Sequence, residues 1–355
     1  MLGLFASHAI VCAESSLPRS TPEAHGLSSV AIRKFVEAAD KELDSIHSFM
    51  LVRNGHVIVE CWWAPESPDK PHIMWSLTKS FTSTAVGLAE AEGKLAIDDK
   101  VLKYFPDNTP DNPSENLKAM RIRDLLTMTA GHDRPPLVRE SGDDWVKQFL
   151  AHSVKHKPGT FFRYNTAASY MLGAIVKKTT GENMIDYLET RLFVPLGIAK
   201  PKWESSPQGI TIGGFGLYVR TEDIAKLGQL YLQKGKWKGK QLLPENWVNM
   251  ATSKQVDNSK GIIYPQSDWL VGYGFQFWQC RHGVYRGDGK DGQFCIVMPQ
   301  YNAVVAMTAN NRDMQAQLNL VWKYLLPAFK DKPLLANEKG LKKLKRTTAG
   351  LKVSK

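Results

Sequence analysis

The sequence predicts an α+β fold, in which one antiparallel sheet flanked by helices is built from both ends of the chain. Three observations lead to this prediction. Residues 48–63 form a hairpin pattern, residues 273–307 return to strand patterns, and residues 97–235 between them show helices and loops without a good hairpin. The economical arrangement is one sheet with a mostly helical lobe beside it. We expect a functional site in the cleft between the two parts.

The N-terminal part begins with a helix and a hairpin. Apolar residues recur at helical spacing over residues 27–43, which predicts a helix. Two runs rich in β-branched and aromatic residues follow, 49–53 and 56–62, and Asn54-Gly55 joins them. This dipeptide is the strongest short hairpin signal. A Pro-rich loop then leads to a second helix pattern, which starts at Ser76.

The middle and the C-terminal part differ in pattern. Helices are predicted over residues 97–105, 122–129, 145–151, 167–180, 184–192 and 222–233, and most of them end at Gly or Pro. Strands are predicted over residues 273–278, 294–298 and 303–307, followed by a helix over 321–329. The predicted organisation is an N-terminal segment 1–16, a discontinuous α/β domain of 17–96 and 236–335, a helical lobe of 97–235 and a basic C-terminal tail of 336–355.

The net charge of +11 raises the question of a nucleic-acid partner. Residues 337–355 contain seven Lys or Arg and one Glu, so this short tail holds +6 of the excess. The rest of the chain mixes both signs and shows no basic stripe interleaved with aromatic residues. We therefore expect no nucleic-acid partner. The tail is predicted to be a frayed, solvated end that could touch an anionic surface.

The four cysteines, Cys12, Cys61, Cys280 and Cys295, fit neither a zinc pattern nor a disulfide framework. We interpret them as buried apolar residues, while a Cys280–Cys295 bridge stays open. No cluster of His, Asp and Glu has metal-ligand spacing, and no phosphate-binding glycine loop occurs. We therefore predict no metal and no cofactor.

Residues 1–16 allow two interpretations. Residues 2–13 are mostly apolar, and Val11-Cys12-Ala13 would suit a signal peptidase, but no Lys or Arg precedes them. A signal peptide and a buried N-terminal segment both stay open. We favour a periplasmic or secreted protein, with a cytoplasmic one as the alternative. No run reaches the roughly 18 apolar residues of a membrane span, so no integral membrane protein is expected.

The stretch from Ser76 to Lys79 is the main candidate for chemistry. The two residues lie one helical turn apart on one face. A serine hydroxyl is a weak nucleophile until a neighbouring base or cation activates it. The start of the helix adds backbone N–H groups that favour a developing oxyanion. A second Ser-x-x-Lys, from Ser67 to Lys70, lies in the Pro-rich loop with no helix behind it, and we interpret it as chance.

Further motifs follow in a specific order. They are residues 76–79, 122–131, 162–166, 213–218 with 223–228, and 289–293. With these motifs, residues 20–330 resemble the penicillin-recognising serine hydrolases, which include class C β-lactamases, D-alanyl-D-alanine carboxypeptidases, family VIII carboxylesterases and 6-aminohexanoate-dimer hydrolases. The resemblance implies a β-lactamase/transpeptidase-like fold and an acyl-serine intermediate.

The resemblance also implies a role for Tyr164, in the motif Tyr164-Asn165-Thr166. Tyr164 would be the general base, and the Lys79 ammonium would lower its pKa by stabilising the phenolate. Thr166 stands where class C enzymes carry Asn. It is shorter than Asn, which counts against β-lactam turnover.

The third element is the Gly-rich stretch 286–293. The match to the Lys-Thr-Gly motif falls on Gly287, Asp288 and Gly289, and glycines let the backbone approach a ligand closely. The backbone N–H groups of Ser76 and Lys290 would form the oxyanion hole. No Lys or His stands at position 287 to hold a substrate carboxylate, a role that Lys290 or Arg286 could take. The residues predicted to bind substrate are Trp75, Thr166, Gly287, Asp288, Gly289, Asp291 and Gln293.

We therefore predict a serine hydrolase that cleaves small ester or amide bonds, with Ser76, Lys79 and Tyr164 as catalytic residues. His72 and His132 lie near motifs but are expected to be structural. One alternative is a β-lactamase or D-alanyl-D-alanine carboxypeptidase. Another, of a different class, is an inactive hydrolase fold that serves as a binding module. The expected partner is a small-molecule ester or amide, and protein partners are unknown.

Overall fold

The computed structural model describes residues 16–353, apart from 138, 140, 141, 143, 260 and 262–265. The predictions for the N-terminal segment and for Cys12 fall on residues 1–15, outside the described part.

The strands are β1 (Ile46–Arg53), β2 (His56–Trp62), β3 (His72–Ile73), β4 (Lys202–Trp203), β5 (Leu217–Val219), β6 (Lys236–Trp237), β7 (Lys240–Gln241), β8 (Trp278–Gln279), β9 (Tyr285–Gly289), β10 (Gln293–Met298) and β11 (Ala303–Ala309). The α-helices are α1 (Ser29–Glu42), α2 (Thr78–Ala91), α3 (Glu115–Ala119), α4 (Ile122–Leu126), α5 (Trp145–Ala151), α6 (Thr166–Thr180), α7 (Met184–Leu188), α8 (Val194–Leu196), α9 (Thr221–Leu232), α10 (Glu245–Thr252), α11 (Met314–Leu320) and α12 (Glu338–Ala349).

The main sheet has six strands in the order β2-β1-β11-β10-β9-β8. The hairpin β1–β2 turns at Asn54 and Gly55, whose φ angles of 50° and 77° are both left-handed, as a two-residue hairpin turn requires. β1 pairs antiparallel with β11, from Ile46 opposite Ala309 to Arg53 opposite Ala303. The prediction that both ends of the chain share one sheet is therefore confirmed.

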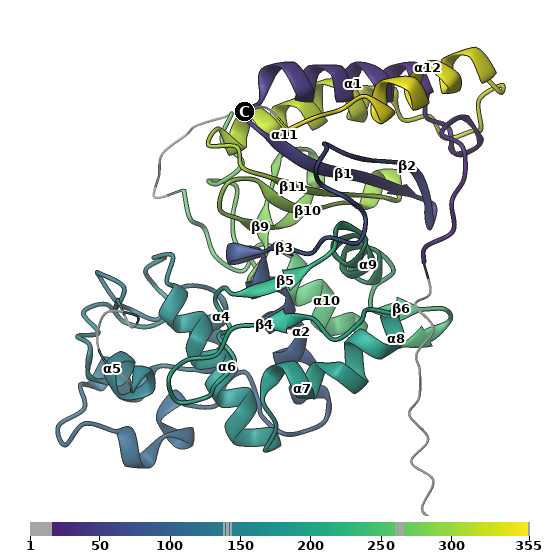
Figure 1. The fold of residues 1–355 in the computed structure, drawn as a ribbon. Helices are drawn as coiled ribbons and strands as arrows, with labels where there is room; N and C mark the ends of the chain where they lie inside the picture. The colour runs from purple at the N-terminus through teal and green to yellow at the C-terminus, as the bar shows by residue number, and fades with distance from the viewer. Residues whose placement is uncertain are drawn as a thin grey trace, which may run out of the picture.

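The sheet is covered on both faces (Figure 1). Helices α1, α11 and α12 pack on one face, where Phe35 and Phe49 lie in the buried core. Helix α9 packs on the other face against β10 and β11, and α2 follows below it in a second core shared with the helical lobe. β3, β5 and β4 form a separate small sheet between the main sheet and the lobe. In the described part of the lobe, no strand joins the main sheet.

Three predicted elements differ from the structure. The helix predicted over residues 97–105 is only a 3₁₀ turn, Val101–Tyr104. Residues 273–278 were expected to form a strand, but only Trp278 belongs to one, β8. The chain turns because Gln276 adopts a left-handed φ of 63°, and Gly274 N–H donates back to the Phe277 carbonyl at 2.8 Å. The helix predicted over 321–329 begins earlier, with α11.

The prediction of a frayed C-terminal tail is wrong. Residues Glu338–Ala349 form α12, and the Asn337 side chain caps the helix by accepting from Gly340 N–H. Leu344 and Leu351 are buried against α1 and the hairpin side of the sheet. These few apolar residues, at helical spacing among many charges, anchor the helix.

Cys61, Cys280 and Cys295 are buried free thiols, so Cys280 and Cys295 form no bridge. Among the described residues, no helix is long and apolar enough to cross a membrane.

Candidate active site

The segment before Ser76 is held in a strained conformation. β3 pairs with β5, and Met74 N–H donates to the Leu217 carbonyl at 2.8 Å. Trp75 then takes a φ of 44°, which is unusual for a bulky residue. A 3₁₀ turn (Trp75–Leu77) leads into α2, and this sharp turn leaves Ser76 half-buried at the start of the central helix.

Lys79 lies at the centre of the site, with only 1% of its surface exposed. Its Nζ lies 3.0 Å from Ser76 Oγ, 2.7 Å from the Gly214 carbonyl and 3.4 Å from Thr166 Oγ1. Burial lowers the pKa of Lys79 to about 7, against the opposing attraction of Asp288. A neutral amine has two N–H donors and one lone pair. The donors can serve Gly214 and Thr166, so the lone pair can face the Ser76 hydroxyl.

Tyr164 completes the group around Ser76. Its ring stacks on Trp278 with centroids 5.5 Å apart, and the neighbouring Ser76 side chain acts to lower the pKa of its hydroxyl. The residue is partly exposed, but the surroundings of its hydroxyl are densely packed, and this burial raises the pKa of Tyr164 above its usual value, as does Asp288. Lys79 Nζ lies over the Tyr164 ring, 5.0 Å from its centroid. The prediction that Lys79 lowers the pKa of Tyr164 is therefore wrong, and the phenol stays protonated.

The start of α6 and the Gly213–Gly214 loop supply the remaining partners of Lys79. Asn165 caps α6 by accepting from Ala168 N–H, and this cap places Thr166 in the first turn. A Cβ on Gly214 would lie 2.6 Å from Thr166 Cγ2, so only glycine lets the two segments approach. We predicted no role for the Gly214 carbonyl, because a backbone acceptor leaves no residue-type signal beyond this glycine.

Strand β9 passes close to the start of α2. A Cβ on Gly287 would lie 2.4 Å from Ser80 Oγ, and one on Gly289 would lie 2.1 Å from the Met74 carbonyl oxygen. Both glycines therefore allow the sheet and the nucleophile helix to meet. The approach is to protein backbone and side chains, so the role of Gly287 and Gly289 in substrate binding stays a prediction.

Two backbone N–H groups are available for an oxyanion. Within the described chain, neither Ser76 N–H nor Lys290 N–H has a hydrogen-bond partner. Ser76 lies in the first turn of a helix, where N–H groups lack intrahelical acceptors, and Lys290 follows the last residue of β9. The Lys290 side chain lies over the Trp75 ring, with Nζ 5.4 Å from its centroid. Both predicted oxyanion donors thus flank the site.

Arg286 and Asp288 form a buried ion pair on β9, with Arg286 Nη2 2.9 Å from Asp288 Oδ2. Arg286 is fully buried and also lies over the Trp269 ring. It is therefore not free to bind a substrate carboxylate. Burial raises the pKa of Asp288, and Arg286 opposes this.

Asp291 and Gln293 shape the turn after β9. The Gln293 amide donates to the carbonyls of Lys290 and Ala309 and accepts from Ala309 N–H. Its polar atoms are thus engaged with backbone, which speaks against a direct substrate contact. Asp291 has a left-handed φ of 63°, and its carboxylate lies 3.6 Å from Lys290 Nζ.

Gln276 is a positioning residue that the sequence did not reveal. Its carbonyl accepts from Ser80 Oγ at 3.1 Å on α2, and its side-chain oxygen accepts from Ser169 Oγ at 2.7 Å on α6. Its amide also donates to Leu126 O at 2.8 Å, at the end of α4. Gln276 thus ties together the helices that carry Lys79 and Thr166.

The two histidines near the motifs are buried. Burial lowers the pKa of His72 and of His132 to about 4, so both are neutral at pH 7. His132 Nδ1 lies 3.3 Å from the amide of Asn165, the α6 cap. No group of three or more His, Cys, Asp or Glu residues suited to a metal ion occurs in the described chain.

Comparison with known proteins agrees with this geometry. The family model described as Beta-lactamase matches residues 40–326. The chain belongs to this family. This match confirms the predicted resemblance and fold class. Members of the Beta-lactamase family are generally serine hydrolases.

Individual relatives are distant. A 6-aminohexanoate-dimer hydrolase of Paenarthrobacter ureafaciens is 25% identical over 282 residues, 73% of this chain and 71% of the relative. A family VIII carboxylesterase structure has a TM-score of 0.64 at 16% identity, covering 88% of this chain and 100% of that one. An octameric penicillin-binding protein homologue from Pyrococcus abyssi has a TM-score of 0.63 at 20% identity, covering 86% and 78%. At these identities the structures establish the fold alone.

Proposed function

We propose that this protein hydrolyses small esters or amides through an acyl-Ser76 intermediate, with Lys79 as the base. The observation that carries the proposal is the 3.0 Å contact between Lys79 Nζ and Ser76 Oγ. Burial leaves the pKa of Lys79 at about 7. A general base works best with a pKa near the operating pH, and this amine meets that requirement.

Acylation begins when Ser76 Oγ attacks the substrate carbonyl carbon and its proton moves to the Lys79 amine. The carbonyl electron pair moves to the oxygen, which the N–H groups of Ser76 and Lys290 stabilise. The bond to the leaving group breaks as the Tyr164 hydroxyl gives it a proton. The proton held by Lys79 then restores the Tyr164 phenol, which returns the amine to its neutral form.

Deacylation repeats the step with water. Lys79 takes a proton from a water molecule as its oxygen bonds to the acyl carbon. The tetrahedral intermediate collapses, the acyl–Oγ bond breaks, and Ser76 recovers a proton from Lys79. The protonated phenol of Tyr164 supports this division of roles, because a phenol with a raised pKa is a donor rather than a base at neutral pH.

The site favours esters and small amides over β-lactams and D-alanyl-D-alanine peptides. Such substrates carry a carboxylate, and Arg286, one of the two cations predicted to hold it, is buried and paired with Asp288. Thr166 also replaces the longer Asn of the class C enzymes. The similarity to a 6-aminohexanoate-dimer hydrolase and to a family VIII carboxylesterase supports an ester or amide substrate by analogy.

The test has two parts. A fluorophosphonate probe should label the wild type and the Ser67→Ala variant, but not the Ser76→Ala variant. No label on the folded wild type would favour the inactive binding module. A panel of p-nitrophenyl esters of rising chain length, run beside short amides and nitrocefin, then separates the substrate classes. Faster turnover of nitrocefin than of every ester would favour the β-lactamase alternative.

A further inference from the structure

The outer edge of β2 is covered at both ends by other segments of the chain. Near its start, Val57 exchanges two backbone hydrogen bonds of 2.8 and 3.0 Å with residues 18–20. Beyond its end, Ala64 exchanges two of 3.0 Å with residues 351–353. Both contacts are parallel bridges. The two segments thus run in the same direction along one edge.

The edge is open between these two segments. In an antiparallel pair, successive residues direct their backbone groups alternately toward the partner strand and away from it. Trp63 N–H points inward, to the His47 carbonyl at 2.9 Å, and Ala64 bonds outward. Because Ala64 bonds outward, the backbone groups of Trp62 and Glu60, two and four residues before it, also point outward. In the described part of the chain, no partner accepts or donates to their backbone N–H and C=O groups.

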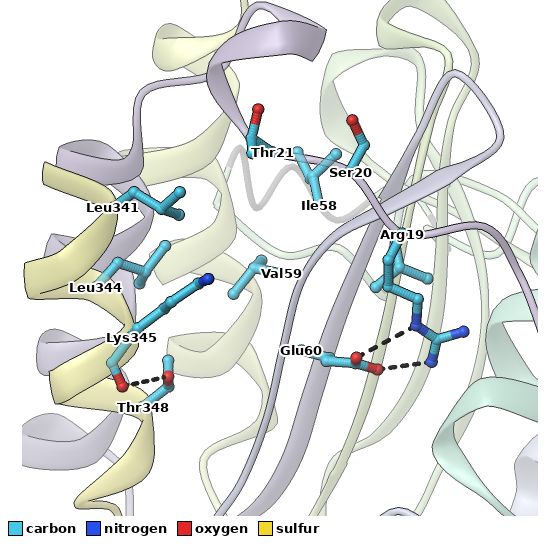
Figure 2. Close-up of a pocket in the computed structure, with 11 residues that line it drawn as sticks. Arg19, Ser20, Thr21, Ile58, Val59, Glu60, Leu341, Leu344, Lys345 and Thr348 are labelled. Atoms are coloured by element: carbon cyan, nitrogen blue, oxygen red, sulfur yellow. Dashed lines mark hydrogen bonds and ion pairs between the residues drawn. The ribbon is translucent and has the colours of Figure 1, made fainter. Parts of the chain in front are cut away.

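A cavity of about 330 Å³ adjoins this open edge, between β2 and α12. Figure 2 shows its walls, which include Val59 of β2 and Leu341 and Leu344 of α12. The Lys345 side chain reaches from α12 across the cavity toward Val59. Within the described chain its ammonium has no ion pair, whereas Arg19 on the opposite side is already bound by Glu60 and Glu222.

We propose that the open edge of β2 is a docking site for an extended acidic segment of another polypeptide, which adds to the sheet as a short parallel strand. The uncovered stretch, residues 59–62, is about four extended residues, or roughly 13 Å, long. Strand addition uses main-chain hydrogen bonds for affinity and side-chain pockets for specificity. The cavity would take an apolar side chain of the segment.

The charge of α12 selects an acidic partner. The helix exposes five cations, at Lys339, Lys342, Lys343, Lys345 and Arg346, against one acid, Glu338. Leu344 packs in the core and Leu341 lines the cavity, so the exposed side is almost purely cationic. An exposed strand edge left without a partner is a liability in a folded protein, and a cationic rim would exclude basic and neutral segments in favour of acidic ones.

The experiment uses the full chain and a fluorescein-labelled, capped tetrapeptide, Glu-Leu-Glu-Val, followed by fluorescence anisotropy. Two singly N-methylated forms, altered at the Leu or at the following Glu, serve as matched controls. Because alternate residues of a strand face the sheet, only one of the two methylations should abolish binding. Equal binding by both methylated peptides would overturn strand addition, and so would absence of binding by the parent peptide.

Variants of the edge test the same point. Glu60→Pro removes the outward N–H without touching the ladder to β1, and should weaken binding about three- to tenfold. Glu60→Gln keeps the N–H and should bind as the wild type does. Lys345→Glu should weaken binding about two- to fivefold, whereas Lys343→Glu, outside the cavity, should have a smaller effect. Ester hydrolysis should be unchanged in all four, which reports that they fold.

Hydrogen–deuterium exchange locates the contact. The peptide should protect residues 58–63, and above all the amides of Glu60 and Trp62. Protection elsewhere would overturn the proposal. Protection of these amides at high protein concentration without peptide, together with a dimer in sedimentation, would identify a second copy of the chain as the occupant and would also overturn it.

Discussion

The chain contains the spacing Ser-x-x-Lys twice within fifteen residues, and the two copies have different surroundings. Ser67 to Lys70 is an exposed turn, in which Lys70 N–H donates to the Ser67 carbonyl at 3.2 Å. The Lys70 side chain is half-exposed and paired with Glu66. Ser76 to Lys79 opens α2, where Lys79 is 1% exposed and its Nζ lies within 3.4 Å of three neutral oxygens.

The comparison separates spacing from environment. The spacing is the same in both copies, and in the second it accompanies a distance of 3.0 Å between Ser76 Oγ and Lys79 Nζ. Lys79 is buried, which disfavours the charged amine, and its hydrogen-bond partners are neutral. The Lys70 side chain is half-exposed to solvent and lies beside the carboxylate of Glu66. Burial lowers the pKa of Lys79 to about 7, so the second copy is the one suited to nucleophilic catalysis.

Removing the nucleophile should have the largest effect. Ser76→Ala should lower kcat/KM by at least about 10⁴-fold, because residues of a catalytic unit carry most of the rate enhancement. The free energy of unfolding should change by only about 1 kcal/mol, the value of one hydrogen bond. Steady-state kinetics and thermal melts check both. Ser67→Ala is the matched control, and a loss of activity there, or retained turnover in Ser76→Ala, would contradict the assignment.

The proton-transfer residues should come next. Lys79→Ala and Tyr164→Phe should each lower turnover by about 10²–10⁴-fold. The double variant should be hardly worse than either, because residues that act as one unit are not additive. Lys70→Ala, the control for Lys79→Ala, should leave turnover unchanged. If the losses of Lys79→Ala and Tyr164→Phe simply multiplied, the two residues would act independently, and near-full activity in Tyr164→Phe would leave a Ser–Lys dyad.

The pH dependence should show the low pKa of Lys79. Below about pH 7 the amine is protonated and cannot act as a base, so kcat/KM should fall about tenfold per pH unit and level off above pH 7. The pH–rate profile of the wild type between pH 5 and 9 measures this. Lys70→Ala should keep the same midpoint. A flat profile over this range would show that Lys79 is not the titrating base.

The smallest effect is expected at Thr166, which accepts from Lys79 at 3.4 Å. Thr166→Val removes this acceptor while keeping the shape, so kcat should fall about two- to tenfold. The pH at which activity is half lost on acidification should also move, because the Lys79 amine loses one hydrogen-bond acceptor. Thr160→Val, at an exposed turn, is the control. An unchanged midpoint in Thr166→Val would remove Thr166 from the proton path.

Local chemistry made much of this protein predictable. The turn at Asn54 and Gly55 accommodates two left-handed residues, so the position of the hairpin turn follows from two residues. α5 occupies the predicted range, and α6 begins one residue earlier, at Thr166, and ends at the predicted Gly181 cap. The one-turn spacing of Ser76 and Lys79 is likewise a property of the helix alone. Such features depend on neighbours in the chain, which a sequence displays directly.

Only the tertiary structure decided the electrostatics of the site. Lys79 meets its acceptor Gly214 across 135 residues of sequence, and its loss of water depends on where the lobe, β9 and α2 come together. The same packing raises the pKa of Tyr164 and hides Arg286 in an ion pair with Asp288. Desolvation is a sum over all surrounding atoms, and those atoms come from distant segments, so no local pattern reports it. The left-handed turn at Gln276 was hidden from the sequence for the same reason, since its contacts lie on three different helices.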